Sequence, residues 1–144
     1  MSHNSSIRLA TPEDAAELAR LLSPLGYPIG ANDVAAVWGE WAAEGNFALV
    51  VQGEASLLGT ITLHRMVVLH RPKPVGRITS LVVDPSVRGQ GLGRALVLAA
   101  EDALVRAGCG LLEVTSHARR TDAHDFYRHF EYEQTSFRFA KVFT

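Results

Sequence analysis

Hydrophobic residues near the N-terminus first alternate with polar ones and then recur at helical spacing. Ile7 to Ala10 alternates weakly, as a short strand does. Thr11 then precedes Pro12 and Asp14, a pattern typical of a helix start, because threonine can cap a helix and proline suits its first position. We therefore predict a strand at 7–10 and a helix over 12–22.

A second helix is predicted after a loop that runs from Ser23 to Gly30. Asn32 or Asp33 is expected to cap it. Its apolar side chains recur at three- and four-residue spacing and form one face; they are Val34, Val37, Trp38 and Trp41. The two tryptophans could form the wall of a pocket, but at this spacing they more often belong to a core.

The middle of the chain favours strands at 47–52, 57–69 and 77–83. The turn residues Gly53 and Glu54 join the first two strands into an antiparallel hairpin. Prolines at 72 and 74 end the second strand, and Asp84-Pro85 ends the third, because proline cannot continue a ladder of backbone hydrogen bonds.

In the last third of the chain, the apolar residues alternate between helical spacing and strand spacing. An alanine- and leucine-rich stretch without proline predicts a helix over 93–107, and Gly108 follows where a left-handed residue often ends a helix. A strand at 111–116, a short helix at 122–130 and a terminal strand at 137–143 complete the order β-α-α-β-β-β-α-β-α-β. This order predicts an α/β (α+β) fold with a mostly antiparallel central sheet, helices on both faces and one parallel strand-helix-strand crossover.

Composition narrows the classes of function. The chain has 144 residues and no internal repeat or long linker, so we predict a single domain over 1–144. Its net charge of −1 gives no basic field for nucleic acid. A lone cysteine, Cys109, rules out an intramolecular disulfide. We find neither a targeting segment nor an apolar run of membrane-spanning length, so the expected location is the cytoplasm, away from membranes.

The most informative segment runs from Arg88 to Arg94 and joins a predicted strand to the longest predicted helix. Its glycines, at alternate positions, let backbone N–H groups approach a ligand closely, and the helix start adds unpaired donors and partial positive charge. That combination binds phosphate. The two flanking arginines favour a pyrophosphate over a single carboxylate.

Other glycine-rich loops fit less well. The spacing is not that of a nucleoside triphosphate loop, and the loop contains no lysine. It also lacks the G-x-G-x-x-G dinucleotide spacing and begins too late in the chain for a doubly wound sheet. The remaining alternative is a helix cap whose glycines serve only the turn, and such a cap would not require three glycines between arginines.

The segment resembles the pyrophosphate-binding motif of the GNAT (Gcn5-related N-acetyltransferase) family, [QR]-x-x-G-x-[GA], with Arg88, Gly91 and Gly93 at its fixed positions. The preceding residues 81–85 resemble that family's fourth strand, and Asp125-Phe126-Tyr127 lies where its late helix carries a tyrosine. The predicted element order is similar over essentially the whole chain.

The resemblance implies an acyl-CoA-dependent N-acetyltransferase that transfers an acetyl group from acetyl-CoA to a primary amine of a small molecule or peptide. The pantetheine arm would lie along Leu81 to Val83, and the loop would hold the pyrophosphate. The cofactor-binding residues implied are Leu81, Val82, Val83, Arg88, Gly89, Gln90, Gly91, Leu92, Gly93, Arg94, Ser116 and Phe126.

The resemblance also implies direct attack of the amine on the thioester, with Tyr127 as general acid for the leaving sulfur and a main-chain N–H near Val83 for the oxyanion. A phenol with a pKa near 10 holds its proton at neutral pH, yet can pass it to a developing thiolate. The alternative is that Tyr127 is only a buried aromatic residue beside Phe126. The general base stays open among Glu113, His117, His64 and His70.

Two positions depart from the family pattern. Glu131 stands where the family commonly has glycine, and Ser116-His117 occupies the region of an asparagine often found after the fifth strand. By the same resemblance the acceptor site would involve residues 22–41 and 64–74. Substrate contacts are expected from Tyr27, His70 and Glu113.

The six histidines are not spaced as ligands of one metal ion, so we predict no metal site. Homodimerisation is expected from family habit alone. Two other classes stay open: a regulatory module that binds CoA without turnover, and a structural domain whose loop binds nothing.

Overall fold

A computed structural model describes residues 6–26, 28–114, 126–128, 132 and 139–143. The chain divides into two compact units, Met1–Glu113 and Val114–Thr144. The first unit holds nearly all of the described secondary structure. No helix in the described ranges is both long enough and apolar enough to span a bilayer.

The strands and helices follow the predicted order. The strands are β1 (Ser6–Leu9), β2 (Asn46–Gln52), β3 (Leu57–Met66), β4 (Val75–Val83) and β5 (Leu111–Val114). The α-helices are α1 (Ala15–Leu22), α2 (Ala31–Ala43) and α3 (Leu92–Arg106). Short 3-10 turns η1 (Pro12–Asp14), η2 (Ser23–Leu25) and η3 (Pro85–Val87) join them.

The five strands form one sheet in the order β1-β2-β3-β4-β5, and the first four pair antiparallel. β5 runs parallel to β4: the Gly110 N–H donates to the Pro74 carbonyl at 3.0 Å, and further along both strands Arg77 Nε donates to Glu113 Oε1 at 2.9 Å. Since α3 connects β4 to β5, the predicted fold class and its single parallel crossover are confirmed.

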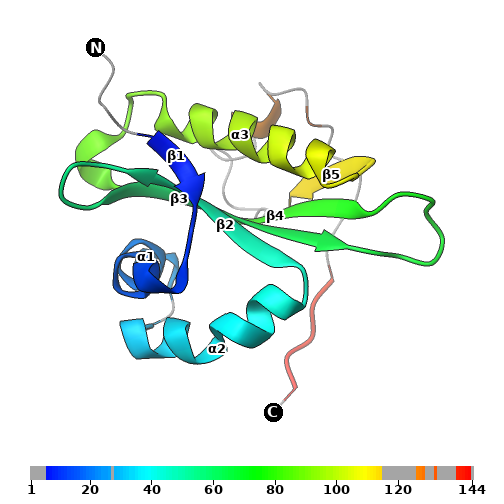
Figure 1. Cartoon of the computed structure of the whole chain (residues 1–144), viewed down its shortest axis with the longest axis horizontal. Helices are drawn as coiled ribbons and strands as arrows, with labels where there is room; N and C mark the ends of the chain where they lie inside the picture. The colour runs from blue at the N-terminus through cyan, green and yellow to red at the C-terminus, as the bar shows by residue number, and fades with distance from the viewer. Residues whose placement is uncertain (1–5, 27, 115–125, 129–131, 133–138, 144) are drawn as a thin grey trace. The chain divides into compact units, whose positions relative to one another are not determined.

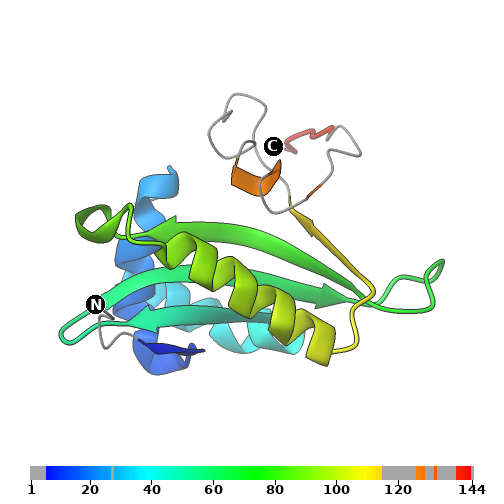
Figure 2. The same cartoon turned by 90° about the horizontal axis from the view of Figure 1, so that it is seen from above.

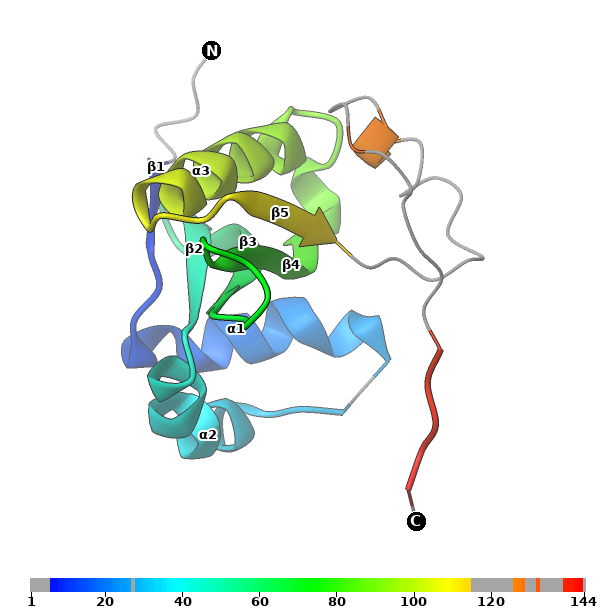
Figure 3. The same cartoon turned by 90° about the vertical axis from the view of Figure 1, so that its right-hand side faces the viewer.

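Helices cover both faces of the sheet (Figure 1). α3 lies across β2, β3 and β4 on one face (Figure 2). α1 and α2 pack together on the opposite face (Figure 3). This three-layer arrangement follows from the alternation in β2 and β3, which sends successive apolar side chains to opposite faces.

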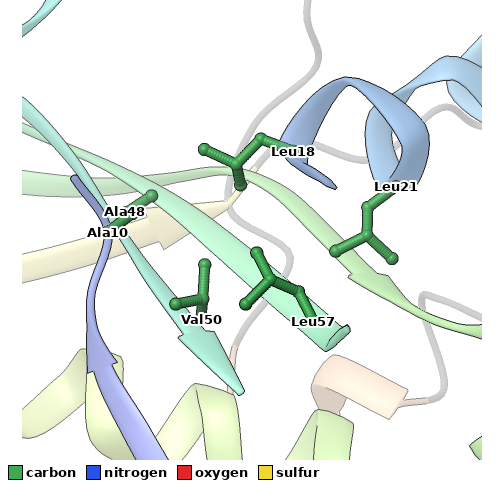
Figure 4. Packing of buried hydrophobic residues seen from close by; sticks show 6 residues of the cluster. All are labelled: Ala10, Leu18, Leu21, Ala48, Val50 and Leu57. Atoms are coloured by element: carbon green, nitrogen blue, oxygen red, sulfur yellow. The ribbon is translucent and has the colours of Figure 1, made fainter. Parts of the chain in front are cut away.

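The core under α1 shows how tightly this layer is held (Figure 4). Leu18 and Leu21 of α1 point toward Val50 of β2 and Leu57 of β3, and all four are at most 2% exposed. Burying a leucine or valine side chain contributes roughly 1.5–3 kcal/mol, so this cluster fixes α1 on the sheet. Trp38, Trp41 and Val82 pack against its margin only partly buried.

The long helix ends as the sequence predicts. Gly108 has φ +88°, and its N–H donates to the Val105 carbonyl while the Cys109 N–H donates to the Leu104 carbonyl. These two bonds form a Schellman motif, in which glycine avoids the strain of a left-handed backbone.

Several predicted boundaries in the first unit are wrong. The third strand begins at Val75 and not at residue 77. The second strand of the hairpin ends at Met66, not at residue 69, because Met66 pairs with Val75, the first residue of β4, and nothing described lies opposite the residues beyond it. Gly30, not Asn32 or Asp33, caps α2. Asp33 acts from inside the helix instead, accepting the Gly30 N–H at 2.8 Å.

The predicted terminal strand at 137–143 is not found in 139–143, which have no regular structure; 137 and 138 lie outside the described residues. Phe139 and Phe143 are 93% and 88% exposed. Alternation shows only that a segment suits a pleated surface, and a strand also needs a partner. Of the late helix predicted at 122–130, the described residues Phe126 to Arg128 are helical.

Candidate functional site

The segment after β4 forms a loop that turns directly into α3. Asp84 and the η3 turn follow the strand, and the chain then passes through Gly89 at φ +81° and Gly91 at φ +80° before α3 begins at Leu92. A side chain in this left-handed region is strained, so glycine is the natural residue at both positions.

The space beside these glycines is open. A Cβ atom built on Gly89 or Gly91 would meet no protein atom within 4 Å. The main chain is therefore accessible from outside at the start of α3, where the first N–H groups have no acceptor inside the helix. Arg88 and Arg94 are both exposed and bracket this opening. The geometry is that of an anion site built from main-chain donors and flanking guanidinium groups.

Asp84 anchors the loop to the rest of the unit. Its N–H donates to the Leu58 carbonyl at 2.8 Å, and its Oδ1 accepts the Ser86 N–H at 2.9 Å and the Ser86 hydroxyl at 2.7 Å. Its Oδ2 accepts Arg20 at 2.7 Å. The two bonds from Ser86, followed by the one from Arg20, lower the pKa of the Asp84 carboxyl to about 2.

Arg20 carries this anchor back to α1. Besides Asp84, its guanidinium donates to the Leu57 carbonyl at 2.8 Å and to Glu17 at 2.9 Å. Glu17 in turn accepts the Leu57 N–H at 2.9 Å. The pKa of Arg20 is raised by these carboxylates, first Glu17 and then Asp84, so the link is fully charged at neutral pH. Arg20 is not among the predicted site residues, because no local sequence pattern relates it to Asp84, which lies far away in the chain.

The end of β4 leads into the loop as expected. Leu81, Val82 and Val83 are half-buried and pair with Ile61, Thr60 and Gly59 of β3 along one edge. β5 runs beside the first part of β4 and ends at Val114, so within the described residues no strand lies against Leu81 to Val83 on the other edge. The Val83 carbonyl accepts Arg88 Nε at 3.4 Å, and the other main-chain groups at such an edge can pair with an extended ligand.

A cavity of about 280 Å³ lies between the two N-terminal helices and the sheet. Trp38 and Trp41, with ring centroids 4.9 Å apart, form part of its wall. The tryptophans thus fulfil both interpretations left open above, since they pack on the core margin and also face this space. Its other described lining residues include Thr62, Thr79 and Ser80, which sequence reasoning did not single out.

The remaining candidates of the first unit lie elsewhere. Glu113 on β5 is ion-paired with Arg77. His64 on β3 pairs with Arg77 near the start of β4, and its Nε2 lies 3.0 Å from the Glu44 carbonyl oxygen. His70 is exposed in the β3–β4 loop and does not line the cavity. Their proposed roles stay predictions. Tyr27, Ser116, His117 and Glu131 lie outside the described residues.

In the second unit, Phe126 and Tyr127 are half-buried and their rings meet edge to face at 5.4 Å. The Tyr127 ring also lies 5.9 Å from that of Tyr132, whose N–H donates to the Tyr127 carbonyl at 3.1 Å. The tyrosine is therefore held in an aromatic cluster of its own unit, and its role as an acid stays a prediction.

The sequence is similar to a known protein family and to proteins of known activity. Residues 13–132 match the acetyltransferase (GNAT) family. An aminoalkylphosphonate N-acetyltransferase of Salmonella typhimurium is 41% identical over 86 residues, covering 60% of this chain and only 56% of that protein. An aminoglycoside N(6')-acetyltransferase type 1 of Stenotrophomonas maltophilia is 31% identical over 134 residues, covering 90% of this chain and 87% of that protein.

Among solved structures, the aminoglycoside N-acetyltransferase AAC(6')-Iy in complex with CoA superimposes with a TM-score of 0.84. The match covers 99% of this chain and 96% of that one at 16% sequence identity. At this identity the likeness concerns the fold, and the fold is the mixed sheet with helices on both faces described above.

Proposed function

Since the chain belongs to the acetyltransferase (GNAT) family, we propose that it transfers an acetyl group from acetyl-CoA to a primary amine of a small molecule or peptide. The observation that carries this proposal is the loop from Arg88 to Arg94, with two left-handed glycines, open space beside them and a helix start. A pyrophosphate needs main-chain donors and charge together, and this loop offers both.

Acetyl-CoA would lie along two neighbouring segments. Its pantetheine arm would pair with the main chain of Leu81 to Val83, and the pyrophosphate would contact the N–H groups between Arg88 and Arg94. The edge of β4 that no described strand covers and the direct passage from strand to loop support this path. Residues Ser116 and Phe126 would add contacts by resemblance to the family.

The reaction would need no covalent intermediate on the protein. The amine nitrogen attacks the thioester carbonyl carbon, a C–N bond forms and the C–S bond breaks. The amine loses a proton to a base that stays open among the candidates above, and the CoA sulfur gains one from Tyr127. A main-chain N–H near Val83 would stabilise the oxyanion.

The relatives support a small-molecule acceptor, because their names specify an aminoalkylphosphonate and an aminoglycoside, both of which carry amines. The matched part of the first of them is little more than half its length, so its substrate does not transfer directly. A cytoplasmic location and a homodimer stay predictions from the sequence, and light scattering of the purified protein would test the homodimer.

Release of free CoA from acetyl-CoA, followed by chromatography with a panel of primary amines, tests the proposal. We expect amine-dependent release by the wild type and a loss of at least tenfold in kcat for Tyr127→Phe with acetyl-CoA binding retained. Binding of acetyl-CoA without release for any amine would favour a regulatory module. The absence of both acetyl-CoA binding and CoA release would contradict the proposal.

A further inference from the structure

The cavity at α2 has apolar walls and a polar floor. Its walls include Leu18 and Leu22 of α1 and Val34, Val37, Trp38 and Trp41 of α2. Its floor is formed by side chains of β3 and β4, including three hydroxyl groups. None of the described residues that line it carries a charge.

An irregularity in β4 creates this floor. Thr62 pairs with Ser80, but the next residue of β3, Leu63, pairs with Ile78, so Thr79 is an extra residue in the ladder. In a regular strand, Thr79 and Ser80 would face opposite sides of the sheet. The bulge instead brings both hydroxyls into the same cavity, where each lies within hydrogen-bond distance of the Thr62 hydroxyl, that of Thr79 at 2.6 Å.

The hydrogen bonds among these three hydroxyl groups leave one O–H donor unused. Each hydroxyl has one O–H and two acceptor lone pairs. Two of the O–H groups are used in the two contacts through Thr62, so one O–H and several lone pairs can bind a ligand. A primary amine matches this set, because it offers N–H donors and one lone pair.

The floor lies next to the expected site of chemistry. Ser80 directly precedes Leu81, where the segment proposed to hold the pantetheine arm begins. An amine hydrogen-bonded to the floor would therefore lie three residues along the same strand from Val83, whose neighbourhood is proposed to stabilise the oxyanion.

We propose that this cavity binds the acceptor, and that the acceptor is a primary amine carrying one uncharged aryl or branched-alkyl group. The inference rests on the proposed function and names its substrate class. A cavity of about 150 Å³ lined by apolar side chains can hold benzene, so 280 Å³ accommodates such a group with a short arm. A phosphonate or a polycationic aminosugar would lose part of its hydration here without a described charge to pair with.

The test compares kcat/KM for three amine classes at one acetyl-CoA concentration: 2-phenylethylamine, 2-aminoethylphosphonate and kanamycin. We expect kcat/KM for 2-phenylethylamine to exceed both others by at least tenfold. Higher kcat/KM for the phosphonate or the aminoglycoside would overturn the substrate class while leaving the proposed function intact. Absence of turnover for every amine, with acetyl-CoA unbound, would instead mark failure of the proposed function, and the inference would fall with it.

A matched pair of variants tests whether the amine binds in the cavity. Val34→Phe should fill the cavity and raise KM for 2-phenylethylamine at least tenfold, with little change for ethylamine, which is too small to need the space. Ala35→Phe, an exposed neighbour that does not line the cavity, should change neither. Equal KM values in both variants and the wild type would overturn the assignment of the cavity.

The hydroxyl floor has its own test. Thr79→Val keeps the shape and removes one hydroxyl, so we expect kcat/KM for 2-phenylethylamine to fall roughly three- to tenfold, as for one hydrogen bond. The KM for acetyl-CoA and the thermal unfolding midpoint should stay unchanged. An unchanged kcat/KM would show that the floor does not bind the amine.

Discussion

The loop at Arg88–Arg94 and the cavity at α2 lie in the same unit but are built differently. The loop is exposed, contiguous in sequence and offers main-chain N–H groups. The cavity is assembled from side chains of α1, α2 and three strands, and its polarity depends on a single bulge. A cofactor common to many enzymes can be bound through the backbone, whereas an individual acceptor must be selected by the shape and polarity of side chains.

The two regions also differ in how they are held. The loop is tied to α1 through polar contacts of Asp84 and Arg20. The cavity wall rests on the apolar cluster of Leu18, Leu21, Val50 and Leu57. Changes in one region should therefore alter one ligand and spare the other.

The largest effect is expected from Gly91→Trp. A bulky residue at φ +80° strains the backbone and fills the open space at the start of α3. Acetyl-CoA at 100 times its Kd should stabilise the wild type by about 2.7 kcal/mol, and this shift should vanish in the variant. Gly39→Ala, on an exposed part of α2, is the control and should retain the full shift. A full shift in both variants would show that the loop does not bind the cofactor.

Trp41→Ala should weaken amine binding and spare acetyl-CoA binding, the opposite of Gly91→Trp. Removing this half-buried ring widens the cavity and costs about 2 kcal/mol of unfolding free energy, below the 3–5 kcal/mol typical of fully buried aromatics. We expect KM for the amine to rise about tenfold. The stabilisation by acetyl-CoA should not change. Loss of cofactor binding in this variant would mean that the two regions are not separate.

Arg20→Ala should have a smaller effect on the cofactor alone. Without Arg20, Asp84 keeps its bonds from Ser86 but loses its link to α1, so the loop is less well positioned. We expect Kd for acetyl-CoA to rise about threefold to fivefold by calorimetry, because exposed ion pairs are weak. Arg106→Ala, which breaks the exposed pair with Asp102 on α3, should leave Kd unchanged.

The smallest expected effect is a dependence of the free energy of unfolding on pH. The pKa of Asp84 falls from near 3.8 to about 2 in the folded protein, so its contribution to stability is fully present above about pH 4. It is lost as the pH falls through the folded value. The difference in urea midpoint between wild type and Asp84→Asn should thus be equal at pH 7 and pH 5 and shrink between pH 4 and pH 3. A difference that grows in this range would contradict the assigned contacts.

The contrast between the regions also explains what could be predicted. The fold class and the loop depend on local patterns, such as Gly108 at a helix end and glycines between Arg88 and Arg94, and both were accessible from sequence. The bulge at Thr79 had a weak signal, since two adjacent polar residues interrupt an apolar strand. The bond between Arg20 and Asp84 had none, because only folding brings α1 beside the end of β4.

Amide hydrogen exchange with and without acetyl-CoA tests the central claim most directly, because it locates the ligand on the main chain. We predict slower exchange over residues 81–83 and 88–95, where N–H groups would bind or be covered by the cofactor, and unchanged exchange in α2. Equal exchange at those residues under saturating acetyl-CoA would contradict the account.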